Sequence, residues 1–308
     1  MVLPVLLKKG SYEMKKITSL LLIFILLTAV SAVNFSAVSI YTEGDYSYAD
    51  VDTNNVALYA YSGESNILII PEEFHGRLVS EVYDYAFENN ADLTVIDFSQ
   101  NDGNLKYIGI KTFAECTGLT GDFELPSSIR QLNIASFQGC TGITSLTINT
   151  GLREIPRQCF NRCSGLEVIN LPSDLESIDD LAFGSCDSLE KILIPRSVTY
   201  ISDTAFTQSD PVLYIYTDSY AHQYAKDKNL RYILIDGPKT GDVNGDGNVD
   251  ILDSTEIQKF AAEMIELTDE QFELADINND GFVDVIDALL VQKYVVGKYD
   301  IPPIIYNS

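Results

Sequence analysis

Apolar residues recur in a fixed pattern through the middle of the chain. Each unit begins with two apolar residues three positions apart. This first step occurs at Val79/Val82, Leu105/Ile108, Ile129/Leu132, Leu152/Ile155, Leu175/Ile178 and Val198/Ile201. A second step then alternates apolar and polar positions, as in Leu166-x-x-Ile169-x-Leu171, and often ends at a proline such as Pro172. Short alternating runs bounded by Pro, Gly and Ser predict β-strands joined by tight turns.

A phenylalanine marks each unit and gives the period of the repeat. The six are Phe87, Phe113, Phe137, Phe160, Phe183 and Phe206, with gaps of 26, 24, 23, 23 and 23 residues. A unit of this length cannot bury its own apolar face, so six units are expected to stack as a solenoid around a shared core. The register predicts one outward row of side chains. This row consists of Asp97, Glu124, Thr147, Asn170 and Leu193.

The cysteines follow the same repeat. Four of them stand three residues after a phenylalanine, at Cys116, Cys140, Cys163 and Cys186, and Cys159 is outside the pattern. Equivalent positions in a stack favour small buried thiols over a disulfide framework. Pairing between sulfurs of adjacent units remains the alternative.

The repeat resembles the bacterial BspA-like leucine-rich repeat, which the segments IPRSVTYISDTAF and LPSDLESIDDLAFGSCDSLEKILIP match closely. The resemblance covers about residues 55–235. It implies a mostly β leucine-rich-repeat solenoid with short strands and short helical or irregular segments. Such a stack needs caps. We expect a tyrosine-rich N-terminal cap over 33–62. The repeats and a C-terminal cap, with a helix at 219–228 and a strand at 230–235, span 63–235.

The amino terminus predicts export. An apolar run from Ile17 to Val30 follows Met14-Lys15-Lys16 and ends in small residues up to Ala32. This pattern is typical of a secretory signal peptide, which we place at residues 1–32, with Met14 as a possible start of translation. The run is shorter than a spanning helix, which disfavours an uncleaved membrane anchor. The mature chain is therefore expected to be secreted and free of the membrane.

The charge of the chain excludes several partners. Forty-five acids against 20 basic residues give a net charge of -25, which repels nucleic acids and anionic membrane surfaces. With two histidines, no tryptophan and no paired base and nucleophile, the 308 residues show no catalytic constellation. We therefore expect a protein that is not an enzyme. An unrecognised polysaccharide hydrolase remains an alternative, because nothing selects a pair among so many carboxylates.

The acids of the C-terminal segment have a regular spacing. Residues 242–253 and 276–287 both carry oxygen ligands at positions 1, 3, 5, 9 and 12 and glycine at position 6, and the two loops are 34 residues apart. Hard cations require oxygen ligands, so the spacing predicts two bound Ca²⁺ ions. The expected ligands, including the position-7 backbone carbonyls of Asn248 and Phe282, are Asp242, Asn244, Asp246, Asn248, Asp250, Asp253, Asp276, Asn278, Asp280, Phe282, Asp284 and Asp287.

Two calcium loops, each followed by a helix, resemble a type I dockerin, a small all-α calcium-binding domain. Gly237-Pro238 prevents a helix from entering the first loop, and a short helix capped by Thr268 and Gln271 enters the second. We place the linker at 236–241, the dockerin at 242–300 and a tail at 301–308. The tail is expected to fold back as an apolar clasp joining the two ends of the module.

The resemblance implies a scaffoldin cohesin as partner, in a cellulosome. The 34-residue duplication relates two exiting helices, which we expect to begin at Asp253 and Asp287, and either could dock. The expected cohesin contacts are Ile251, Leu252, Gln258, Lys259, Val285, Ile286, Gln292 and Lys293.

Together these features predict a secreted, non-catalytic cellulosome-associated protein. The solenoid is then expected to bind a protein or a cell-wall glycan during degradation of plant polysaccharides. Adhesion at the cell surface is the alternative within the class of interaction proteins.

Overall fold

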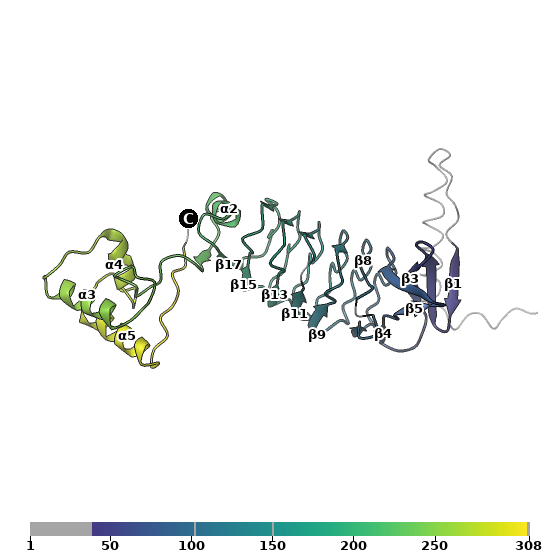
Figure 1. Cartoon of the computed structure of the whole chain (residues 1–308), viewed down its shortest axis with the longest axis horizontal. Coiled ribbons are helices and arrows are strands. Elements are labelled where there is room, and N and C mark those ends of the chain that lie inside the picture. Colours follow the sequence, from purple (N-terminus) through teal and green to yellow (C-terminus); the bar gives the residue numbers. More distant parts are fainter. Residues whose placement is uncertain (1–38, 102, 150, 307–308) are drawn as a thin grey trace, which may run out of the picture. The chain divides into compact units, whose positions relative to one another are not determined.

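The computed structural model describes residues 39–101, 103–149 and 151–306. The predicted signal peptide lies outside these residues. Figure 1 shows the order of the elements, from an N-terminal sheet through the repeated turns to a group of helices.

The tyrosine-rich N-terminal stretch forms three antiparallel strands of a larger sheet that continues into the repeats. Strand β1 (Ile40–Glu43) pairs with β2 (Tyr46–Asp50), which pairs with β3 (Asn55–Tyr61). Strand β3 then runs parallel to β6 (Arg77–Val82), to which β5 (Glu73–Phe74) pairs antiparallel. The N-terminal strands thus pair with the first strand of the repeats.

Each repeat contributes two strands to the solenoid. The strands of the second apolar step are β4 (Ile67–Ile69), β7 (Val95–Asp97), β9 (Gly121–Leu125), β11 (Ile143–Ile148), β13 (Val168–Asn170), β15 (Lys191–Leu193) and β17 (Val212–Ile215). Those of the first step are β8 (Tyr107–Ile108), β10 (Gln131–Leu132), β12 (Glu154–Ile155), β14 (Ser177–Ile178) and β16 (Tyr200–Ile201). Pairing between turns is parallel, and Thr147 stands between Glu124 and Asn170, as the predicted outward row requires.

The six repeat phenylalanines form one continuous stack inside the solenoid. Adjacent ring centroids are 5.4, 5.3, 5.9, 5.7 and 5.7 Å apart, and the rings are inclined by 7 to 22°. Offset stacking at this spacing is favourable beyond the burial of the rings. Leucine, isoleucine and valine side chains from both strand steps lie in the same core, together with the cysteines. The predicted shared core is therefore confirmed.

The five cysteines are free, buried thiols. In each repeat cysteine the Sγ donates to the carbonyl oxygen of the phenylalanine one turn back, for example Cys140 to Phe113 at 3.1 Å and Cys163 to Phe137 at 3.2 Å. Ser209 fills the same slot in the last unit, and its hydroxyl donates to the Phe183 carbonyl at 2.6 Å. A side-chain donor to the preceding phenylalanine carbonyl is therefore common to these five positions, a feature that the spacing alone did not reveal.

These thiols are expected to be inert in the folded protein. Burial raises the pKa of Cys116, Cys159 and Cys186 to about 12, and raises that of Cys140 and Cys163 as well. A thiolate forms only as the pH approaches the pKa, so at about pH 8 the reactive species is nearly absent.

An aromatic disulfide reagent should therefore label no cysteine of the native chain and all five after denaturation. Ser173→Cys, at an exposed position, should add a single fast-reacting thiol and serves as the control. Rapid labelling of the unmodified native chain would contradict the expectation.

The helix and the strand that the sequence predicts after the last repeat are both present. Helix α2 (Tyr220–Lys228) begins after Ser219, whose hydroxyl accepts from the His222 backbone N–H, and is followed by β18 (Tyr232–Leu234), parallel to β17. The edge of β18 that does not pair with β17 pairs with the C-terminal tail. Tyr306 of the tail exchanges two backbone hydrogen bonds with Tyr232, at 3.0 and 2.8 Å, and their rings stack.

The C-terminal segment contains three helices, α3 (Ile251–Ala261), α4 (Asp269–Ala275) and α5 (Val285–Val295). They share a small core of their own that includes Val243, Ile257 and Val291. Ile301 of the tail packs against this core, as expected of a clasp, whereas Tyr306 pairs outside the module. The fold class is therefore a mostly β solenoid followed by a small helical domain. Among the described residues, no helix has the length and apolar character needed to cross a membrane.

Candidate calcium loops and docking helices

The first acidic loop is organised by hydrogen bonds from its backbone to its own side chains. The Gly247 N–H donates to Asp242 Oδ2 at 2.9 Å, Asp246 N–H to Asn244 Oδ1 at 2.8 Å and Asn248 N–H to Asp246 Oδ1 at 2.9 Å. Gly247 has a φ of 89°, a conformation that favours glycine and turns the chain back toward Asp242. The loop therefore has the sharp turn that its sequence predicts.

The second loop repeats these bonds at the equivalent positions. Gly281 N–H donates to Asp276 Oδ2 at 2.9 Å, Asp280 N–H to Asn278 Oδ1 at 3.0 Å and Phe282 N–H to Asp280 Oδ1 at 3.0 Å. The duplication seen in the sequence is thus a duplication of backbone geometry.

The carboxylate at position 12 of each loop is buried and accepts hydrogen bonds from the backbone of that loop. Asp253 is fully buried and accepts from the backbone N–H groups of Val243, Asn244 and Asp250 at 2.9, 3.1 and 2.8 Å. Asp287 is equally buried and accepts from the corresponding donors of its loop. Burial raises the pKa of both carboxyls, and the N–H donors oppose that rise.

The exiting helices begin two residues earlier than predicted. Helix α3 starts at Ile251 and α5 at Val285, so the expected starts at Asp253 and Asp287 are wrong. The reason is that Asp250, the position-9 residue, is also the N-cap and accepts from the Leu252 N–H at 2.7 Å. Asp253 completes a capping box with it, as Asp287 does with Asp284 in the second half.

The donor set of the loops suits a calcium ion. Asp242 Oδ1 is buried and has no hydrogen-bond partner, which is costly for a carboxylate oxygen unless a cation satisfies it. Within the described residues, no cluster of three or more His, Cys, Asp or Glu side chains is placed to hold a metal ion. The other oxygen donors of each loop are asparagine side chains and a backbone carbonyl, and calcium accepts both kinds of donor.

The predicted partner contacts lie mainly on the surface of α3 and α5. Ile251, Leu252, Val285 and Ile286 are 50 to 65% exposed, although large apolar side chains usually avoid water. Gln258 and Lys293 are also exposed, and Lys259 is half-buried beside Glu256.

Gln292 has a contact that sequence reasoning missed. Its Nε2 donates to Ser254 Oγ at 2.9 Å, and the Ser254 hydroxyl donates to the Ala288 carbonyl at 3.0 Å. Ser254 is fully buried, so this chain of bonds joins α3 to α5. In the alignment of the two halves Ser254 and Ala288 occupy equivalent positions, and this alignment was the sequence feature that could have indicated the contact.

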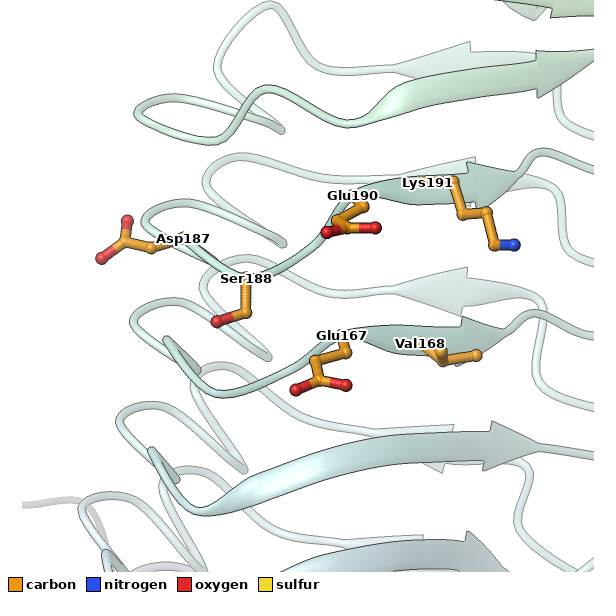
Figure 2. A pocket seen from close by; sticks show the side chains of 6 residues that line it. All are labelled: Glu167, Val168, Asp187, Ser188, Glu190 and Lys191. Atoms are coloured by element: carbon orange, nitrogen blue, oxygen red, sulfur yellow. The ribbon is translucent and has the colours of Figure 1, made fainter.

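The solenoid presents a polar hollow on its strand face (Figure 2), next to β13 and β15. Its volume is about 480 Å³. It is lined by Glu167, Val168, Asp187, Ser188, Glu190 and Lys191. Asp187 and Ser188 come from the turn before β15, while Glu167 and Glu190 occupy equivalent positions in consecutive units.

Comparison with known families divides the chain into two regions. A model described as a BspA type leucine rich repeat region matches six copies over residues 80–212, and a type I dockerin domain model matches residues 240–296. No enzyme family is found, and no curated protein matches the chain. Type I dockerins are calcium-binding domains, and their presence implies a cohesin partner.

Two solved structures are similar to part of the chain. A leucine-rich cell surface protein from Faecalibacterium prausnitzii is 24% identical, with a TM-score of 0.49, over 59% of this chain and 55% of that one. A leucine-rich repeat protein from Bacteroides ovatus is 21% identical, with a TM-score of 0.44, over 57% of this chain and 55% of that one. The match thus spans about half the length of each of these proteins. The chain therefore carries a region that matches the BspA type leucine rich repeat, followed by a region that matches the type I dockerin domain.

Proposed function

We propose that the protein is a secreted component of a cellulosome, in which the dockerin binds a scaffoldin cohesin only when calcium is present. The observation that carries the proposal is the repetition of the same backbone-to-side-chain bonds in the two acidic loops. Each loop leads into a helix whose surface exposes large apolar residues. A protein partner would remove this apolar surface from water.

Two calcium ions are proposed, one in each loop. The residues that would hold the first are Asp242, Asn244, Asp246, Asn248, Asp250 and Asp253. Those for the second are Asp276, Asn278, Asp280, Phe282, Asp284 and Asp287. When bound, the ions supply positive charge between carboxylates that otherwise repel one another. The chain itself contributes the glycine turns and the N-caps that hold the loops against the helices.

Titration calorimetry of the full chain against an array of recombinant type I cohesin modules tests this function. We expect at least one cohesin to bind with a stoichiometry of one, and excess chelator to abolish the heat. Asp246→Ala with Asp280→Ala, which removes the position-5 ligand from both loops, should have the same effect as the chelator. Asp300→Ala removes an exposed acid outside the loops and is the control. Binding that persists in chelator would overturn the proposal.

For the solenoid we propose binding of a protein or a cell-wall glycan. The support is the regular outward row on the strand face, which is polar except at Leu193, and in which Asn170 Nδ2 donates to Thr147 Oγ1 at 3.1 Å. Asn149 Nδ2 also donates to Glu124 Oε1 of this row, at 3.0 Å. Stacked outward positions of this kind form the extended binding surfaces of solenoids. Incubation of the full chain with insoluble cell-wall polysaccharide tests the glycan case. Sedimentation with the polysaccharide supports it, and release of soluble sugar would instead show a hydrolase.

A further inference from the structure

The two docking helices differ in the surface that they present, although their loops are equivalent. Residues spaced by four, eight and eleven positions lie on one side of a helix. On α5 and at its C-cap this side consists of Val285, Leu289, Lys293 and Val296. On α3 the equivalent residues are Ile251, Thr255, Lys259 and Ala262. The side faces away from the buried residues Ile257 and Val291 in each half.

The α5 side has more apolar surface than the α3 side. Leu289 is 46% and Val296 65% exposed, and their counterparts are a threonine and an alanine. The Thr255 hydroxyl donates to the Ile251 carbonyl at 2.8 Å, so it is already used within its own helix. A partner that covers α5 therefore removes more apolar area from water than one that covers α3.

The lysines at equivalent positions of the two helices, Lys259 and Lys293, differ in their ion pairing. Lys259 Nζ lies 2.7 Å from Glu256 Oε1, an ion pair within α3. In α5 the residue equivalent to Glu256 is Leu290, and within the described part of the chain Lys293 has no ion-pair partner. A carboxylate of a partner can pair with Lys293 without competition, whereas at Lys259 it must compete with Glu256.

We propose that this dockerin docks predominantly through the α5 side, formed by Val285, Leu289, Lys293 and Val296, and not equally through either helix. The inference rests on the proposed binding of a cohesin. The α5 side is an apolar stripe that contains one lysine without an ion-pair partner among the described residues. The cohesin surface that fits it has an apolar patch bordered by a carboxylate. The preference for α5 over α3 is expected to be about tenfold or more in affinity.

Matched substitutions at equivalent positions test the preference. Leu289→Asp and Val296→Asp change the α5 side, and Thr255→Asp and Ala262→Asp make the same change in charge on α3. Each full-chain variant is titrated with the cohesin that binds the unmodified protein, in saturating calcium. We expect the α5 variants to lose at least about tenfold in affinity and the α3 variants to stay within about twofold. Helicity in calcium, measured by circular dichroism, reports whether each variant folds.

Two equivalent faces would give a different result. If either helix could dock, loss of one face would cost no more than about twofold, because the other orientation remains. Equal small losses on both helices, or a larger loss on α3, would therefore overturn the inference. Leu289→Thr with Val296→Ala, residues that the other half tolerates, is the fallback if an aspartate variant fails to fold, and it should also weaken binding. Failure of the unmodified chain to bind any cohesin would instead overturn the proposed function on which the inference rests.

Discussion

Removal of calcium is expected to unfold residues 242–300 and leave the solenoid folded. The helical domain has a small core, with seven buried apolar residues, and small domains of this kind usually need a metal or another covalent or ionic constraint. Eight loop carboxylates approach one another as the loops close, and Asp242 Oδ1 is buried without a partner. Binding of calcium and folding should therefore be coupled.

Hydrogen exchange of the full chain, with and without chelator, measures the two regions separately. Amide protection in α3, α4 and α5 should fall close to that of an unfolded peptide, while the strands from β6 to β17 keep their protection. Asp276→Ala, which removes the position-1 ligand of the second loop, should raise the calcium concentration needed for folding. Asp300→Ala, outside the loops, should not. Helices that remain protected in chelator would contradict the coupling.

The repeat made the solenoid predictable from sequence. The stack of phenylalanines and the Thr147 register both follow from a period that recurs six times. Each repeat therefore supports the same assignment of strands in the other repeats. The helix at 219–228 and the strand at 230–235 followed from their own sequence patterns. The fold class and the place of the helical domain along the chain therefore follow from the amino-acid sequence alone.

Features that depend on single contacts were not predictable in the same way. Asp250 stands at a position that suits both a calcium ligand and a helix N-cap. Its sequence position alone does not predict that the N-cap role sets the start of α3. The Ser254 bond to Gln292 joins residues 38 positions apart, and the Tyr306 bridge to Tyr232 joins two distant segments. Neither contact has a periodic signal. The hydrogen bond of each cysteine to a phenylalanine carbonyl depends on the geometry of adjacent turns.

The ring stack predicts a large loss of stability when it is interrupted at its centre. Phe160 is buried, with Phe137 on one side at 5.9 Å and Phe183 on the other at 5.7 Å. Phe160→Ala removes both ring contacts and leaves a cavity that the rigid turns cannot close. We expect the free energy of unfolding of the solenoid to fall by about 4 kcal/mol.

A denaturant titration in saturating calcium, followed by far-ultraviolet circular dichroism, measures this loss. Tyr200→Ala is the control, because Tyr200 is an aromatic residue of the same solenoid that is 48% exposed, and its loss should cost less than about 0.5 kcal/mol. Phe160→Leu, which refills part of the cavity, should recover more than half of the loss. In a solenoid each turn is stabilised by its neighbours, so the transition of Phe160→Ala should also broaden as the turns before and after residue 160 unfold separately. A loss below about 1 kcal/mol would contradict the expected contribution of the stacked rings to the stability of the solenoid.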